Sequence, residues 1–166
     1  MPFARIQLAI DNCEKCLKAL DDSDPNKIAI ESYLTASVTI LIISEYERLI
    51  ESLFCKRADR CGDGEVAAHI HWFMDKRFRS PDLRKINQTL GTFSGASRSA
   101  FFGPLENTAA HAAWDNLMKA RHAWVHGESG FNITFRELKA TYPKTKDVLR
   151  QLLSTLGIPT TAVNGL

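Results

Sequence analysis

The sequence has no long hydrophobic run. Its longest apolar stretch covers residues 37–44 (SVTILIIS), far short of the roughly 20 apolar residues that cross a membrane as a helix. The N-terminal residues, MPFARIQLAIDN, also lack the regions of a signal peptide. We therefore expect a cytoplasmic protein without a membrane partner, in which residues 37–44 belong to a buried core helix.

Charge of one sign is also scarce. The 21 Lys and Arg are nearly balanced by 19 Asp and Glu, which leaves a net charge of +2. Dedicated nucleic-acid binders usually carry a denser basic surface, so any contact with RNA has to come from local clustering. The densest cluster is either a solvated helix face or a surface that guides RNA phosphates; it contains Arg77, Arg79, Arg84 and Lys85.

Cysteines are few, and their spacing matches no familiar zinc site, even when the neighbouring His69 and His71 are added. One pair forms a C-x-x-C on a predicted helix, and the other pair is separated by five residues. We expect reduced structural thiols, as in a cytosolic protein, and neither a metal nor another cofactor. The four thiols are Cys13, Cys16, Cys55 and Cys61.

No segment has the alternating pattern of a strand, whereas apolar residues recur every three or four positions. A helix is expected to begin at Ser80-Pro81-Asp82 and to stop near Gly91, and the Gly- and Ser-rich residues 91–104 are interpreted as a loop with at most one turn of helix. The other predicted helices cover 3–20, 26–58, 65–78, 107–126 (from Asn107 or Thr108) and 135–156.

Local signals define several helix ends. Asp24-Pro25 is typical of a helix start, and Gly127 of a helix stop. Thr134 and Glu137 form a capping-box pattern, while Pro143 is expected to break or kink the last helix. Together these signals predict an all-α fold: one helical domain over 1–158, a bundle with two long central antiparallel helices, and a flexible tail over 159–166.

The end of the 107–126 helix carries a chemically suggestive pattern, Arg121-His-Ala-Trp-Val-His126, followed by Gly127. It resembles the Arg-x-x-x-x-His signature of the HEPN domains, a family of helical bundles that contains many metal-independent RNases. His122 stands at the position where that signature often has a polar residue. On an ideal helix Arg121 and His126 lie about 140° apart, whereas His122 and His126 share a face.

An earlier long helix resembles the second element of the HEPN pattern, an acidic or amide residue that faces the Arg-His helix. Glu47 interrupts an apolar stripe, where an unpaired carboxylate is costly, so we expect it to pair with Arg121. Glu51 lies about 40° from Glu47 around the helix and is a rival candidate, whereas Glu45 lies about 160° away and is expected to face solvent.

The resemblance implies a cleavage reaction in which an RNA 2′-hydroxyl attacks the adjacent phosphorus. His126 would act as general acid or base, Arg121 would stabilise the phosphate, Glu47 would orient Arg121, and His122 would support the site. It also implies a homodimer, in a toxin or defence effector with an antitoxin or other regulatory partner. A non-catalytic HEPN module that dimerises and binds a partner protein or a nucleotide is the alternative.

One position departs from the pattern of a subset of HEPN toxins. These proteins have a Tyr two residues after the His, which a partner nucleotidyltransferase modifies. Here that position is Glu128, so regulation by that route is not expected.

Overall fold

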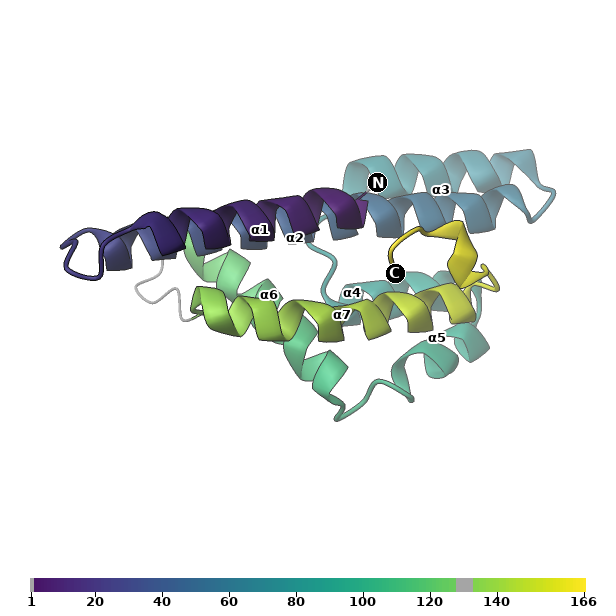
Figure 1. The fold of residues 1–166 in the computed structure, drawn as a ribbon. Coiled ribbons are helices and arrows are strands. Elements are labelled where there is room, and N and C mark those ends of the chain that lie inside the picture. Colours follow the sequence, from purple (N-terminus) through teal and green to yellow (C-terminus); the bar gives the residue numbers. More distant parts are fainter. Residues whose placement is uncertain (1, 128–132) are drawn as a thin grey trace.

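The computed structural model describes residues 2–127 and 133–166, and these residues form helices without any strand (Figure 1). The predicted all-α fold class is therefore confirmed. Glu128 lies outside the described residues. The elements are α1 (Pro2–Ala19), α2 (Lys27–Asp59), α3 (Gly64–Arg77), α4 (Leu83–Phe93), α5 (Gly95–Phe102), α6 (Ala109–His126), α7 (Phe135–Thr155) and the short 3₁₀-helix η1 (Thr160–Ala162).

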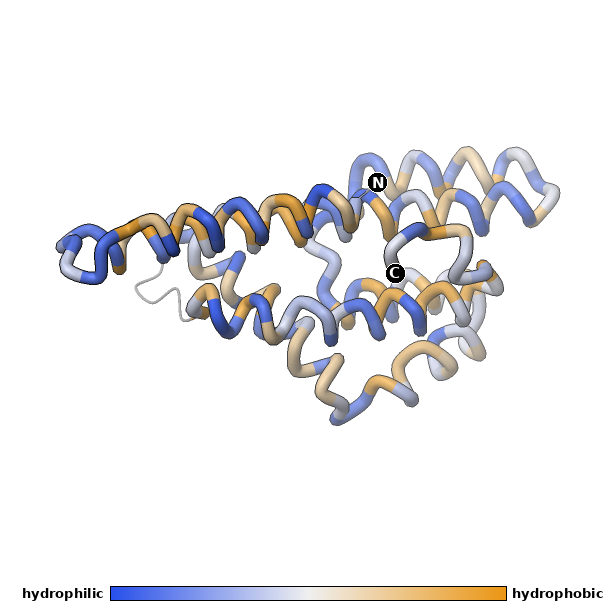
Figure 2. The backbone as a smooth tube through the Cα atoms, viewed as in Figure 1, coloured by the Kyte–Doolittle hydropathy of each residue, from blue (hydrophilic) through white to orange (hydrophobic). Residues whose placement is uncertain are grey.

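The helices are arranged around α2, which packs against α1, α3, α6 and α7. Figure 1 shows α1 along the N-terminal part of α2 and α3 along its C-terminal part, while α6 crosses obliquely beneath. The helices α2 and α6 run in opposite general directions in this view. In Figure 2, hydrophobic and hydrophilic positions alternate along most helices, as expected where one side of each helix packs against others.

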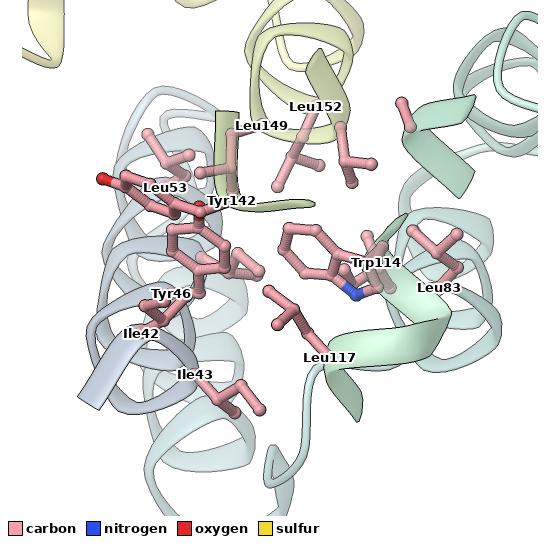
Figure 3. Packing of buried hydrophobic residues seen from close by; sticks show 14 of the residues in the cluster. Ile42, Ile43, Tyr46, Leu53, Leu83, Trp114, Leu117, Tyr142, Leu149 and Leu152 are labelled. Carbon is pink, nitrogen blue, oxygen red and sulfur yellow. The ribbon is translucent and has the colours of Figure 1, made fainter. Parts of the chain in front are cut away.

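An aromatic pair joins α2 to α6 at the centre of the core. The rings of Tyr46 and Trp114 are stacked with centroids 5.1 Å apart, and both side chains are fully buried (Figure 3). The Tyr46 hydroxyl lies 2.7 Å from Thr145 Oγ1 on α7, so three helices meet at this point. Burial raises the pKa of the Tyr46 phenol, which keeps it neutral.

Local signals place several boundaries as predicted. Thr108 Oγ1 accepts a hydrogen bond from the amide of His111 at the start of α6, and Gly127 ends that helix with φ 66°. Thr134 and Glu137 form the predicted capping box at the start of α7. These signals act within a few residues, which explains why the sequence identifies them.

The expected stop at Gly91 and the expected loop over 91–104 were wrong. α4 continues through Gly91 to Phe93, whose ring stacks on Phe54 with centroids 5.8 Å apart. A second helix, α5, then begins at once, because Ser94 Oγ caps the amide of Ser97. Packing of the aromatic residue outweighs the roughly 1 kcal/mol that a glycine costs inside a helix.

The two proline signals differ in outcome. Asp24-Pro25 precedes a helix as expected: Asp24 Oδ1 accepts a hydrogen bond from the amide of Asn26 in a turn, and α2 begins at Lys27, one residue after the predicted start. The expected break or kink at Pro143 is not found. Pro143 lies on the exposed side of α7, and that helix continues across it to Thr155. A helix held by packing on its other side can thus accommodate the missing amide.

The C-terminal segment also differs from the expected flexible tail. Gly157, with φ 65°, reverses the chain after α7, and Ile158 and Val163 are buried in the core. Lys146 Nζ donates a hydrogen bond to the carbonyl oxygen of Gly165 at 2.7 Å. Gly165 lies against the side chain of Phe3 in α1, so residues beyond 158 complete the core at the N-terminal end of α1.

By length and composition alone α2 could cross a membrane, a property that core helices of soluble proteins share. In the structure it contributes twelve buried residues to the bundle. Val38, Ile42 and Ile43 are among them, in agreement with the buried core helix predicted for 37–44. The cytoplasmic location stays a prediction.

Candidate functional site

The Arg-x-x-x-x-His motif occupies the last two turns of α6. Arg121 is half-buried there, whereas His122 and His126 are exposed. Arg121 and His122 line a pocket of about 310 Å³ between α6 and the start of α4. The same pocket is lined by Ser80, Asp82, Met118 and Lys119.

The structure gives Arg121 a partner that the sequence did not indicate. Its Nη1 donates a hydrogen bond to Ser80 Oγ at 2.7 Å. Ser80 belongs to the α3–α4 linker, residues 78–82, and has φ 55°, a left-handed conformation that residues with a Cβ rarely adopt. Trp114 on α6 also holds this linker, because its indole N–H donates to the carbonyl oxygen of Pro81 at 2.9 Å.

Glu47, expected to pair with Arg121, pairs with Arg79 instead. The distance from Glu47 Oε1 to Arg79 Nη1 is 3.8 Å. Arg79 and Ser80 are consecutive residues of the linker, so α2 holds the linker through Glu47 and α6 holds it through Arg121. Glu47 and Arg121 are therefore linked through the position of this segment.

The expectation that Glu45 faces solvent was wrong. Its side chain is only 9% exposed and lies 2.6 Å from Arg5 Nη1 of α1, with Arg48 Nη1 at 3.7 Å. The helical-wheel argument assumed one buried face, whereas α1 covers a second side of α2. Glu51, the rival candidate, is half-buried one turn before Cys55. Burial, followed by the negative charges of Glu51 and Asp59, raises the pKa of the Cys55 thiol.

The two histidines of the motif lie against each other. Their ring centroids are 4.2 Å apart, at an interplanar angle of 46°, as the four-residue spacing predicts. His122 also lines the pocket that contains Arg121. The ring of His126 lies against His122 and is therefore next to a lining residue of that pocket. A pair of imidazoles next to a guanidinium can supply a base, an acid and a phosphate ligand at neutral pH.

The predicted basic cluster divides into two kinds of residue. Arg79 donates to the carbonyl oxygens of Phe78 and Asp75, and Lys85 donates to the carbonyl oxygen of Arg79, so both support the corner between α3 and α4. Arg77 and Arg84 are exposed beside this corner. The cluster therefore combines structural cations with cations that are open to solvent.

Sequence reasoning missed Ser80 as a site residue and Lys119 as a second cation of the pocket. Ser80 was interpreted only as part of a helix-start signal, and that signal says nothing about which helix lies opposite. Among the residues that the structure describes, no three His, Cys, Asp or Glu side chains gather as a metal site. The chain matches no family model, no curated protein sequence and no solved structure.

Proposed function

We propose that this chain is an endoribonuclease of the HEPN type that cleaves RNA by attack of its own 2′-hydroxyl. The observation that carries the proposal is the cluster at the end of α6. There Arg121 and His122 line one pocket, and the His126 ring lies against that of His122. The pattern that resembles the HEPN signature thus coincides with a surface pocket large enough to admit a phosphate.

The reaction needs a base, an acid and a group that stabilises negative charge. One imidazole takes the proton of the 2′-hydroxyl as its oxygen bonds to phosphorus. The P–O5′ bond breaks, and a protonated imidazole delivers a proton to the leaving 5′-oxygen. The products are a 2′,3′-cyclic phosphate and a 5′-hydroxyl. His126 and His122 can share the two proton-transfer roles, because their rings are in contact.

Arg121 would stabilise charge on the non-bridging phosphate oxygens. A guanidinium has five N–H donors, and among the described residues Arg121 donates one hydrogen bond, to Ser80. Ser80 therefore replaces Glu47 as the group proposed to orient Arg121. Because the substrate supplies the nucleophile, the reaction requires no metal, and DNA is not a substrate.

A homodimer in which two copies of this site face one cleft belongs to the same proposal. Exposed apolar side chains near the site support it. Tyr33 of α2 is 64% exposed and contacts the Trp124 ring edge-on at 5.4 Å, and Val125 is 52% exposed. Such a dimer would act as a cytoplasmic toxin or defence effector, held in check by an antitoxin or another regulatory protein.

The same apolar residues also favour the second candidate, a non-catalytic module that dimerises and binds a partner protein or a nucleotide. The pairing of Glu47 with Arg79 is compatible with this alternative, since the expected acidic partner of Arg121 is engaged elsewhere. The two candidates differ in one respect that can be measured: only the nuclease changes the covalent structure of RNA.

The test is cleavage of total RNA by the purified chain in excess EDTA. Wild type is expected to cut and leave 2′,3′-cyclic phosphate ends, whereas Arg121→Ala and His126→Ala are not. Arg136→Ala and His71→Ala are matched controls, because both residues are exposed outside the pocket. Absence of cleavage by wild type, or equal cleavage by all variants, would favour the binding module. Toxicity on expression that His126→Ala abolishes would support the nuclease in cells.

A further inference from the structure

The outer side of α3 carries an exposed aromatic surface. α3 packs mainly against α2, and on its open side Val66 is 47% exposed and Trp72 51% exposed. The His69 ring stacks on the Trp72 ring with centroids 6.0 Å apart and an interplanar angle of 30°. The three-residue spacing makes His69 and Trp72 neighbours on the helix surface, whereas Val66 lies about 120° around the helix from Trp72 and nearer its N-terminal end.

An exposed tryptophan of this kind is unusual, because large aromatic side chains normally contribute to the core. Trp114, for comparison, is fully buried between α2 and α6. His69 covers part of the Trp72 ring, and about half of the side chain stays open to a ligand. A flat, half-open ring is suited to stacking against another flat group.

The segment of the chain that contains this aromatic surface has a positive net charge. Residues 56–85 contain eight Lys or Arg and five Asp or Glu, a net charge of +3, whereas the whole chain has +2. Lys76 lies one turn after Trp72 on the same side of α3, where it also pairs with Asp75 at 2.7 Å. Arg77, at the end of α3, and Arg84, at the start of α4, are also exposed.

We propose that Trp72, together with Lys76 on the same side of α3 and with Arg77 and Arg84 at the corner between α3 and α4, forms a docking surface for single-stranded RNA. An unpaired base would stack on Trp72, and the cations would contact the adjoining phosphates. The positive charge selects a polyanion over an apolar partner. This inference rests on the proposed function, which supplies RNA as the ligand class.

The position of the surface fits a route to the pocket. Arg77, the last residue of α3, lies about 8 Å from Trp72 along the helix axis. The α3–α4 linker follows, and its Ser80 accepts a hydrogen bond from Arg121. A single-stranded RNA with one base stacked on Trp72 can therefore extend along the cations of the corner between α3 and α4 toward His122 and His126. Duplex RNA cannot bind in this way, because its bases are already stacked on each other.

The experiment measures binding separately from cleavage. A fluorescein-labelled 2′-O-methyl oligouridylate is used, which has no free 2′-hydroxyl and cannot be cut by the proposed reaction. By fluorescence anisotropy at low salt, Trp72→Leu is expected to weaken binding about tenfold, whereas Trp72→Phe keeps most of the affinity. Val66→Ser, at an equally exposed apolar position of α3, is the matched control and should bind like wild type.

Three outcomes would overturn the inference. Wild type does not bind the oligonucleotide, Trp72→Leu binds it as tightly as wild type, or Trp72→Leu loses as much affinity for a duplex of the same length as for the single strand. A change of oligomeric state in Trp72→Leu, measured by light scattering, would assign this surface to a protein interface instead. Binding that depends on Trp72 without any cleavage would retain the docking surface and reject the nuclease. If wild type cleaves RNA and Trp72→Leu binds the oligonucleotide as tightly as wild type, the nuclease is retained and the docking surface is rejected.

Discussion

Two substitutions of Ser80 can distinguish the energetic contribution of its hydrogen bond from the cost of its backbone conformation. Its Oγ accepts the hydrogen bond from Arg121 at 2.7 Å, and its φ is 55°. A hydrogen bond to a charged group contributes up to about 3 kcal/mol, and a half-exposed guanidinium that can rehydrate should lose about 1 kcal/mol. The left-handed conformation costs a residue with a Cβ about 1 kcal/mol relative to glycine.

Ser80→Ala should therefore lower the free energy of unfolding by about 1 kcal/mol, because it removes the acceptor and keeps the strain. Ser80→Gly removes the same acceptor but relieves the strain, so it should lie within about 0.5 kcal/mol of wild type. Urea denaturation followed by circular dichroism measures both values. Equal stability of the two variants would refute the reasoning about strain.

Catalysis should respond differently from stability. Both Ser80 variants leave Arg121 without its acceptor, so both should cleave RNA about tenfold more slowly, because a misplaced catalytic group loses orientation. The rate of cleavage by equal amounts of folded protein checks this. If Ser80→Gly cleaves like wild type, Ser80 does not position Arg121, and the proposed replacement of Glu47 by Ser80 fails.

Three further predictions concern the frame around the site. Glu45→Gln should lower the free energy of unfolding by about 1 kcal/mol, measured by urea denaturation, because it weakens the pairing with Arg5, a side chain that is 60% exposed. Trp114→Phe should cost about 2 kcal/mol and slow RNA cleavage, because it removes the indole hydrogen bond to Pro81 and leaves a void; an unchanged cleavage rate would show that the linker keeps its place without it. Tyr142→Phe should gain about 1 kcal/mol at neutral pH, because the buried hydroxyl has no hydrogen-bond partner among the described residues. Burial raises the pKa of Tyr142 from 10.0 to about 12, so wild type should lose stability as the pH rises from 10 to 12 and the unfolded chain ionises first, and this loss should be smaller in Tyr142→Phe.

The sequence predicted those parts of the fold that depend on neighbouring residues. The caps at Thr108 and Gly127 and the contact between His122 and His126 need only helix geometry, and each is found where expected. The missed helix α5 differs, since its composition favours a loop and the burial of Phe101 gives it a place in the core. Tertiary packing determines the secondary structure of such a segment, and composition alone does not indicate that packing.

The assignment of the acidic residues failed for a related reason. A helical wheel ranks residues by angle around one helix, and it works when only one side of that helix is covered. α2 is covered by α1 as well as by the rest of the bundle, so Glu45 is more buried than Glu47. No angle on α2 could have indicated this, because the position of α1 decides which carboxylate meets a cation.

The α3–α4 linker changes how the candidate site should be understood. The expected pair would have placed Glu47 of α2 in direct contact with Arg121 of α6. Instead, Glu47 holds Arg79 and Arg121 holds Ser80, so a short segment between two helices connects the acid to the guanidinium. The position of Arg121 then depends on this linker as well as on α6. Because the same linker connects α3 to the pocket, any ligand that shifts α3 would also act on the proposed phosphate-binding group.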